Sequence, residues 1–311
     1  MVDFLKLISN SKDIIDKILN RKDLEKIEQK VNVIEVFEIK KYKLRFEFRK
    51  AWENNQHIGY SSVEIRLKPH YVFNNHLHNA NDFNPSDCIC VINEVFSFLS
   101  IQQNEFKEFY VINIEIGLNM IINRDVESFM NGVIYYKKSP FKINKNINSK
   151  ISDTSERKQI KIYAKGLQFQ DLKEININTI RYEIKSKKSN YIKKTLGIET
   201  LDKLLLTKTY SNVFSELIKE LKYILIIDIN PNLKGQGKEN RNYLTKTSKV
   251  NYWKGLTDEK YKSQFDYERK KYNRITSIKD EFDTLVLNTL MRLHNSEFLP
   301  KDYALNNFIK T

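Results

Sequence analysis

Short runs in which apolar and polar residues alternate recur through the chain to about residue 185, and they constrain its fold more than any other feature. Residues 31–37 and 44–49 alternate with a period of two, which is typical of strands that bury one face. The basic segment at residues 40–43 can turn between them, so the two runs predict a β-hairpin. Similar runs predict strands at residues 62–73, 109–122, 132–136, 159–165 and 179–185.

Helical patterns lie at both ends of the chain and between the strands. Apolar residues near a 3.6-residue period predict a helix over residues 3–29, and Pro85 suits the first turn of a helix that reaches about residue 101. The expected fold is therefore α+β, with a mainly antiparallel sheet and flanking helices. Further helices are predicted at residues 188–196, 210–227, 256–275 and 277–294.

The patterns also predict how the chain is organised. Strands followed by a helix occur twice before residue 228, which is a weak sign of two pseudo-repeated halves. The Asn-rich residues 74–85 are expected to form a loop, and residues 138–158 a flexible excursion. The predicted parts are an N-terminal helical segment (1–30), an α+β core (31–229), a basic linker (230–250) and a small C-terminal helical module (251–311).

The chain is strongly basic. It has 53 Lys and Arg against 39 Asp and Glu, a net charge of +14, and a pI of about 9.4. A pI of this kind is typical of proteins that bind nucleic acid. The alternative is a basic surface without a specific partner, because Asn, Ile and Lys are enriched together, as an A+T-rich genome would produce.

Cysteine content and hydropathy indicate the compartment. Cys88 and Cys90 are the only cysteines, which excludes a disulfide scaffold or a four-thiolate zinc site and favours a reducing environment. No run approaches 18 apolar residues, and the first residues lack the order of a signal peptide. We therefore expect a cytoplasmic protein with no membrane partner.

Four of the five histidines lie between His57 and His78. One continuous strand would place His70, His76 and His78 on the same face, and the spacing of the last two can aim both imidazoles at one metal ion. A divalent ion such as Mg²⁺ or Mn²⁺ could then polarise a scissile phosphate. The alternative is a polar loop whose His and Asn side chains cap local backbone groups.

Glu115 is flanked by apolar residues of a predicted strand. A buried carboxylate needs a partner, which could be a metal ion, a cation or a backbone donor. Gly117, two residues further, would allow a bulge or the close approach of another backbone. The alternative is that Glu115 simply lies on the polar surface of the sheet.

Tyr163 and Lys165 are two residues apart in a predicted strand, so they should point to the same face. A nearby lysine lowers the pKa of a phenol, and a tyrosine beside a metal-bound phosphate could attack a phosphodiester and hold DNA covalently. Tyr135 and Tyr136 are rival candidates. Because the chain has 17 tyrosines, a half-buried structural role is an equal alternative for each of them.

Arg181 and Glu183 share one face of the strand predicted at residues 179–185. They could bind each other, a phosphate or a metal ion, and a surface ion pair is the alternative. Basic residues of this strand and of the predicted linker are candidate DNA contacts: Arg181, Lys185, Lys234, Lys238 and Arg241.

The order of these motifs resembles that of a known family, the replication-initiation proteins of the filamentous-phage gene II/X type, and more closely their relatives on mobile elements of Bacteroidetes. The likeness covers roughly residues 55–228. It is carried by Pro69-His70-Tyr71, residues 78–83, residues 113–119, the Tyr-x-Lys-Gly motif at 163–166, Arg181-Tyr182-Glu183, and a Lys-Lys-x-Leu-Gly-Ile-x-Thr-Leu-x-x-Leu run at 193–204.

The resemblance implies rolling-circle initiation by an HUH-type nuclease. In such enzymes a central antiparallel sheet presents metal-binding histidines and a carboxylate, and a tyrosine nicks one strand, leaving a 5′-phosphotyrosyl link and a free 3′-hydroxyl. Carried over, Tyr163 would be the nucleophile. The partner would be origin DNA, single-stranded or as a hairpin, with a host helicase as a further candidate. The metal would be held by His78, with His76 or His70, and by Glu115.

Two departures from the family pattern leave alternatives open. The histidines lie in an Asn-rich stretch, and Lys165 follows Tyr163 at two positions instead of the common three. A different tyrosine could be catalytic, or the protein could bind DNA without cutting it. A basic structural protein of a phage or mobile-element particle is a third possibility.

Overall fold

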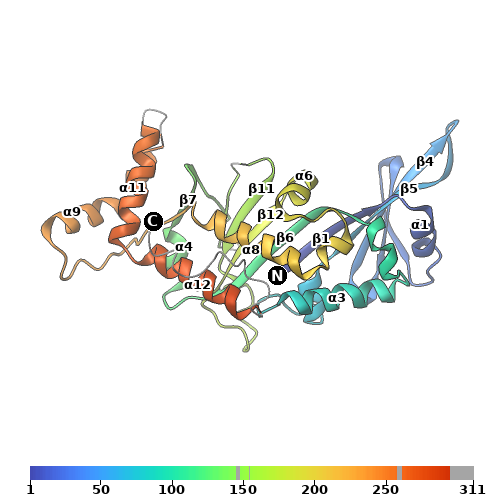
Figure 1. Ribbon diagram of the computed structural model, residues 1–311, viewed down its shortest axis with the longest axis horizontal. Helices are drawn as coiled ribbons and strands as arrows, with labels where there is room; N and C mark the ends of the chain where they lie inside the picture. Colours follow the sequence, from blue (N-terminus) through green and yellow to red (C-terminus); the bar gives the residue numbers. More distant parts are fainter. Residues whose placement is uncertain (145–147, 154, 258–260, 295–311) are drawn as a thin grey trace.

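The computed structural model describes residues 1–144, 148–153, 155–257 and 261–294. It confirms the α+β class. A long antiparallel sheet of ten strands crosses the molecule, and helices flank it (Figure 1). In spatial order the strands are β2 (Glu25–Lys30), β3 (Ile34–Ile39), β4 (Leu44–Glu53), β5 (Gln56–Leu67), β1 (Val2–Ser9), β6 (Tyr110–Ile121), β12 (Thr179–Ser186), β11 (Lys158–Tyr163), β10 (Ser149–Ile151) and β9 (Lys142–Asn144).

A second, three-stranded sheet and the helices complete the described fold. The small sheet has the order β13 (Ile224–Ile226), β7 (Val133–Tyr136) and β8 (Ser139–Pro140). The α-helices are α1 (Lys12–Leu19), α2 (Pro69–Phe73), α3 (Pro85–Phe98), α4 (Val126–Gly132), α5 (Lys165–Gln168), α6 (Ser189–Tyr191), α7 (Leu201–Leu204), α8 (Thr207–Leu221), α9 (Lys238–Thr247), α10 (Val250–Gly255), α11 (Lys262–Ile275) and α12 (Ile278–Arg292). Short 3₁₀ helices lie at Val31–Val33, Lys40–Tyr42 and Gln103–Glu108, and a π turn lies at Ile192–Leu196.

The alternation seen in the sequence gives the sheet one apolar and one polar face. In β12 the side chains of Ile180, Tyr182 and Ile184 are buried on the apolar face. Helices α8 and α12 cover this face. The hydroxyl of Tyr182 donates to the carbonyl of Leu217 in α8 at 2.9 Å, and its ring lies 6.3 Å from that of Phe282 in α12. The remaining side chains of β12 therefore point to the polar face.

The N-terminal segment differs from the prediction. Residues 3–29 were expected to form one helix, but they form β1, α1 and β2. Strand β1 lies in the middle of the large sheet, between β5 and β6, and buries Leu5 and Leu7 with a period of two. The helical period is confined to α1, whose buried side chains include Ile14 and Ile18. Long-range strand pairing therefore overrides the helical reading of this segment.

Other boundaries also shift. Strand β5 ends at Leu67, because Pro69 begins α2, whereas the sequence predicted a strand to residue 73. The helix predicted at 210–227 ends at Leu221, before β13. The excursion predicted at 138–158 contains β8, β9 and β10, and the linker predicted at 230–250 contains α9. Residues 145–147 and 154 of that excursion, and residues 258–260 and 295–311 of the predicted C-terminal module, lie outside the described residues.

The predicted hairpin and the predicted start of one helix are confirmed. Strands β3 and β4 pair from Ile34 with Arg49 to Ile39 with Leu44, as the first two alternating runs predicted. Helix α3 begins at Pro85. Strand β1 pairs with β5 on one side and with β6 on the other, so the strands before and after α3 belong to one continuous sheet. In the described part of the chain, none of the helices combines the length and apolar character needed to cross a bilayer.

Gly117 marks a close approach in the sheet, as expected. A Cβ atom at this position would lie 2.8 Å from the carbonyl oxygen of Tyr182 and 3.0 Å from Nη2 of Arg181. We expect Gly117→Ala to destabilise the protein by about 1–3 kcal/mol, because the neighbouring strand must shift. Thermal unfolding measures the loss. Gly255→Ala is the matched control, since no atom lies within 4 Å of its added Cβ. Equal melting temperatures for the two variants would contradict the prediction.

Candidate active site

Three neighbouring strands bring the predicted polar residues together. Strand β12 pairs with β6 on one side and with β11 on the other. The register places Glu183 opposite Lys161 of β11, and Arg181 opposite Tyr163 of β11. Residues that face each other in an antiparallel pair share one face of the sheet, so these side chains form two adjacent rows on the polar face.

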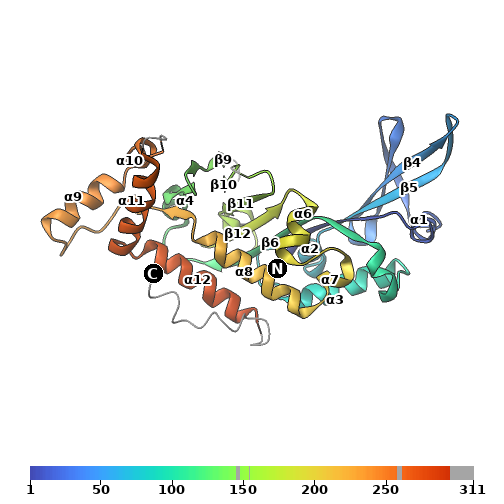
Figure 2. The ribbon, with the colours of Figure 1, turned by 45° about the horizontal axis from the view of Figure 1, so that its top comes forward.

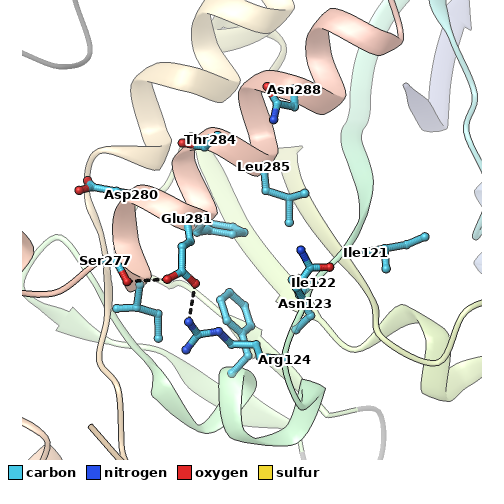
Figure 3. A pocket seen from close by; sticks show the side chains of 13 residues that line it. Ile121, Ile122, Asn123, Arg124, Ser277, Asp280, Glu281, Thr284, Leu285 and Asn288 are labelled. Carbon is cyan, nitrogen blue, oxygen red and sulfur yellow. Dashed lines mark hydrogen bonds and ion pairs between the residues drawn. The ribbon is translucent and has the colours of Figure 1, made fainter. Parts of the chain in front are cut away.

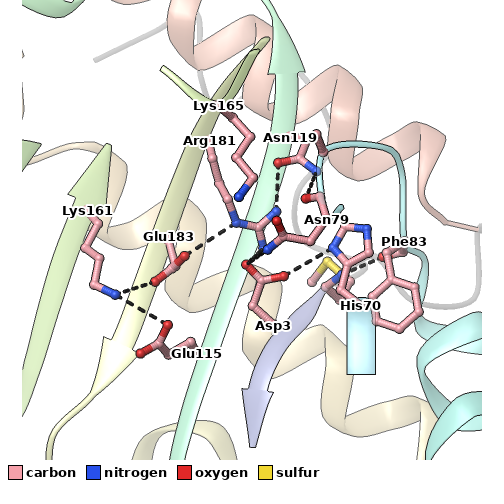
Figure 4. Close-up of polar contacts among 12 residues, drawn as sticks. Asp3, His70, Asn79, Phe83, Glu115, Asn119, Lys161, Lys165, Arg181 and Glu183 are labelled. Carbon is pink, nitrogen blue, oxygen red and sulfur yellow. Dashed lines mark hydrogen bonds and ion pairs between the residues drawn. The ribbon is translucent and has the colours of Figure 1, made fainter. Parts of the chain in front are cut away.

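The first row is a chain of ion pairs (Figure 4). Lys161 Nζ lies 2.8 Å from Glu183 Oε1 and 3.4 Å from Glu115 Oε2, and Lys185 Nζ lies 2.6 Å from Glu115 Oε1. The partner that Glu115 requires is therefore a pair of lysines. Burial alone would raise the pKa of Glu115, but Lys161 and Lys185 outweigh burial and lower it.

The second row is built around Arg181, which is fully buried. Its guanidinium lies 2.5 Å from Asp3 Oδ2 of β1, donates to Asn119 Oδ1 of β6 at 2.7 Å, and lies 3.4 Å from Glu183 Oε2. Burial favours a raised pKa for Asp3, but Arg181 and His70 outweigh it and hold the pKa well below its usual range. Arg181 therefore positions Asp3 and Glu183, and its buried side chain does not reach the protein surface.

Tyr163 lies opposite Arg181 in the second row and is only half-buried. Its hydroxyl donates to Glu183 Oε2 at 3.0 Å. Burial and the Glu183 carboxylate raise the pKa of this phenol well above its usual value, which reverses the expectation that a lysine would lower it. Burial also raises the pKa of Glu183. A carboxylate with a raised pKa, already hydrogen-bonded to the phenol, is placed to act as a general base.

Lys165 lies next to Tyr163, as predicted, but it lies in a helix and not in the same strand. It is the first residue of α5 and not part of β11, yet its Nζ lies 5.3 Å from the centre of the Tyr163 ring. A cation at this distance from an aromatic face is attracted to the ring. Burial, together with the nearby Arg181, lowers the pKa of Lys165 to about 8.

The histidines do not share a strand face. His70 lies in α2, His76 has a left-handed backbone with a φ of 64°, and His78 follows in the loop, where its Nδ1 accepts from the backbone N–H of Ala80 at 3.3 Å. His70 joins the second row from the other side, with Nδ1 3.1 Å from Asp3 Oδ1 and Nε2 2.9 Å from Asn81 Oδ1. Residues 74–84 thus form a loop, as the alternative prediction expected, and α3 begins at Pro85.

The predicted metal ligands do not form a ligand set in this structure. Both ring nitrogens of His70 already have partners, and both oxygens of Glu115 face lysines. Within residues 1–144, 148–153, 155–257 and 261–294, no group of three or more His, Cys, Asp and Glu side chains is arranged to hold a metal ion. Divalent-metal dependence therefore stays a prediction.

The rival tyrosines are poorly placed for attack on DNA. Tyr135 and Tyr136 lie in β7 of the small sheet and are 3% and 0% exposed. The hydroxyl of Tyr136 donates to the buried carboxylate of Glu220.

A hollow of about 530 Å³ lies between the end of β6 and α12, where Arg124 pairs with Glu281 (Figure 3). None of the residues in the two polar rows lines this hollow.

Sequence reasoning missed three residues of the site. Asp3 was assigned to a helix, although an acidic residue among Val2, Phe4 and Leu5 was a usable signal. Asn119 and Lys161 lay inside motifs that had been singled out, but had no role assigned. The candidate DNA contacts lie in different parts of the molecule. Lys185 is half-buried beside Glu115, whereas Lys234, Lys238 and Arg241 are exposed and lie in α9 or just before it.

No protein-family model matches the sequence, and no curated protein is significantly similar to it. Among solved structures, a rolling circle replication initiator protein from Geobacillus stearothermophilus superposes with a TM-score of 0.41 at 10% sequence identity, covering 77% of this chain and 89% of that chain. The di-domain ARO/CYC StfQ from the steffimycin biosynthetic pathway superposes with a TM-score of 0.12 at 7% identity, covering 90% of this chain and 99% of that chain. Both TM-scores are too low to establish a common fold, so the function is inferred from the residues of the site.

Proposed function

We propose that this protein is a DNA replication initiator of a phage, plasmid or other mobile element, which binds its origin and nicks one strand through Tyr163. The observation that carries the proposal is the hydrogen bond from the Tyr163 hydroxyl to Glu183, on the polar face of the central sheet. Lys161 and Lys165 flank this pair, and their charges can attract a phosphate group.

The proposed reaction transfers one ester bond. Glu183 accepts the phenol proton as the Tyr163 oxygen attacks the phosphorus atom. The bond from phosphorus to the 3′ oxygen breaks, that oxygen takes up a proton from solvent water, and the 5′ phosphate stays on the tyrosine. Lys161 and Lys165 offset the negative charge that builds up on the phosphate oxygens in the transition state.

Two other functions are compatible with a basic α+β protein. The first is a DNA-binding protein of the same fold in which Tyr163 and Glu183 are only structural. The second is a basic structural protein of a phage or mobile-element particle. A defined DNA site separates the initiator and the DNA-binding protein from the particle protein, and a covalent adduct separates the initiator from both.

The proposal is tested with supercoiled DNA from the protein's own element. With Mn²⁺ or Mg²⁺ present, we expect nicked circles that carry the protein on a 5′ end, detected by a mobility shift that survives denaturation and disappears after protease treatment. A parallel reaction in EDTA tests the predicted metal dependence. If no divalent ion yields an adduct on the origin, the nickase proposal fails, and the DNA-binding alternative takes its place.

Lys165 gives the reaction a specific pH dependence. Because the pKa of Lys165 is lowered to about 8, its positive charge is lost as the pH rises through that value. We expect adduct formation in single-turnover reactions to fall by up to about tenfold per pH unit above this point. Lys165→Arg should flatten the fall, because a guanidinium stays protonated. Identical profiles for both proteins between pH 7 and 9.5 would contradict an electrostatic role for Lys165.

A further inference from the structure

Helices α9, α10 and α11 form a small helical unit at one end of the molecule, beyond the small sheet (Figures 1 and 2). Trp253 is fully buried in it, and its Nε1 donates to the carbonyl of Thr247 at 2.7 Å, which ties α10 to the end of α9. The hydroxyl of Tyr243 in α9 donates to Glu268 Oε2 in α11 at 2.9 Å. The α9–α11 unit therefore holds its three helices together with contacts of its own.

The unit is joined to the sheet body through α11. The Phe265 ring lies 5.6 Å from that of Tyr135 in β7, and the hydroxyl of Tyr272 accepts from the backbone N–H of Asp228 at 2.7 Å. Helix α12, which was predicted to belong to the same C-terminal module, packs instead on the apolar face of the large sheet. The opposite side of the unit, which includes most of α9, faces solvent.

Positive charge is concentrated in this unit. Residues 234–275 contain 12 Lys and Arg and 5 Asp and Glu, so 42 residues carry +7 of the net charge of +14. A biased nucleotide composition would spread lysine evenly along the chain, so it does not account for this concentration. Within the described residues, nine exposed cations of this region have no ion-pair partner: Lys234, Lys238, Arg241, Lys246, Lys249, Lys254, Lys270, Lys271 and Arg274.

Helix α9 presents a polar face that has no protein partner in the described part of the chain. Leu244 and Thr247 are its buried residues. Lys238, Arg241, Asn242 and Thr245 are exposed, and their spacing of three, four and seven residues places them on one face. An α-helix with its side chains is about 10–12 Å across, which matches a major groove about 12 Å wide. Arginine and asparagine are the residue types that read guanine and adenine edges in that groove.

We propose that the α9–α11 unit is a second DNA-binding surface, which takes double-stranded DNA with α9 in the major groove. Arg241 and Asn242 contact base edges, while the surrounding lysines contact phosphates. The proposal rests on DNA as the partner but not on the nicking chemistry, because the unit and the Tyr163 site lie in different parts of the molecule (Figures 1 and 2). A duplex held at this end would leave the polar face of the sheet free for the strand to be cut.

The test compares two full-length variants that each lose three positive charges. One is Lys238→Gln/Arg241→Gln/Lys246→Gln in the unit. The other is Lys12→Gln/Lys22→Gln/Lys107→Gln. These exposed lysines lie in α1, just after it, and in the adjoining Gln103–Glu108 helix, and they have no ion-pair partner among the described residues. Helix α1 lies at the opposite end of the molecule from α9 (Figure 1). Fluorescence anisotropy with a labelled duplex, repeated at several salt concentrations, gives the affinity and its salt dependence. All six positions are exposed, so both variants should fold, and circular dichroism checks this.

We expect the first variant to lose about 10- to 1,000-fold in duplex affinity and its salt slope to fall by about 2–3, because each phosphate contact contributes roughly 0.9 to that slope in duplex DNA. The second variant should stay within about threefold of the wild type. Asn242→Ala should narrow the preference for origin over scrambled duplex by about tenfold, with little change in binding to scrambled DNA.

Three outcomes would overturn the proposal. Equal losses for the two triple variants would mean that only net charge matters. A loss seen with single-stranded DNA or RNA but not with duplex would assign the surface to a different nucleic acid, and a loss seen only with an acidic peptide would assign it to a protein partner. Adduct formation on a single-stranded origin oligonucleotide is measured alongside, so a failed duplex site and a failed nickase remain distinguishable.

Discussion

Tyr163→Phe will abolish the covalent protein–DNA adduct, lowering its formation by at least about a thousandfold, while duplex affinity stays within a few-fold of the wild type. The substitution removes only the hydroxyl that donates to Glu183. Glu183 keeps its contacts with Lys161 and Arg181, so the loss in stability should be about 1 kcal/mol. The readout is the denaturation-resistant adduct on origin DNA, with melting temperature and anisotropy as checks on fold and binding.

Two further variants sharpen this result. Glu183→Gln keeps a hydrogen-bond acceptor but not a base, so we expect adduct formation to fall by about 10²- to 10⁴-fold. Tyr135→Phe is the control for a tyrosine that is buried in the small sheet, and it should nick as the wild type does. Nicking by Tyr163→Phe together with its loss in a Tyr135 or Tyr136 variant would show that the nucleophile had been assigned wrongly.

Arg181→Met will destabilise the protein by about 3–5 kcal/mol at neutral pH. The substitution leaves Asp3 buried without its guanidinium partner and frees the Oδ1 of Asn119. Urea unfolding at pH 7 measures the loss. Arg292→Met is the matched control, because Arg292 pairs with Asp82 at an exposed position, where an ion pair contributes about 0–1 kcal/mol.

The same variant should respond to pH in a defined direction. In the wild type, Arg181 lowers the pKa of Asp3, so the stability that it contributes is present above the ordinary carboxylate pKa and is lost only in strong acid. Without Arg181, burial raises the pKa of Asp3, and protonation relieves the buried charge as the pH falls. The difference in the free energy of unfolding between wild type and variant should therefore become smaller toward pH 4. A gap that is independent of pH would mean that Asp3 is not the group left unpaired.

The proposed division between the two surfaces has a structural basis. The Tyr163 site lies on the polar face of the central sheet, where its cations are held by carboxylates, as Lys161 is by Glu183 and Glu115. Such a site can bind one phosphate but offers little net charge for a duplex. The exposed cations of the α9–α11 unit that have no ion-pair partner among the described residues would supply that charge elsewhere. Recognition and cutting can then be separated by mutation, which is what the two sets of variants test.

Local sequence patterns determined much of the core. Alternation with a period of two located β3, β4, β6, β11 and β12, because a strand with one buried face repeats at that interval whatever its neighbours are. The same rule placed Arg181 and Glu183 on one face. The register of β11 with β12, which only the structure shows, places Tyr163 opposite Arg181 and brings the two motifs into one site.

Only the tertiary structure decided what surrounds that site. Residues 2–9 carry apolar residues that suit either a helix or a strand, and pairing with β5 and β6, more than 50 residues away along the chain, selects the strand and places Asp3 against Arg181. The even spacing of His70, His76 and His78 would place them on one face only if all three lay in one strand. They do not, because Pro69 begins a helix that contains His70. Burial of Arg181 and the long-range contacts of Asp3 depend on distant segments, which no local periodicity encodes.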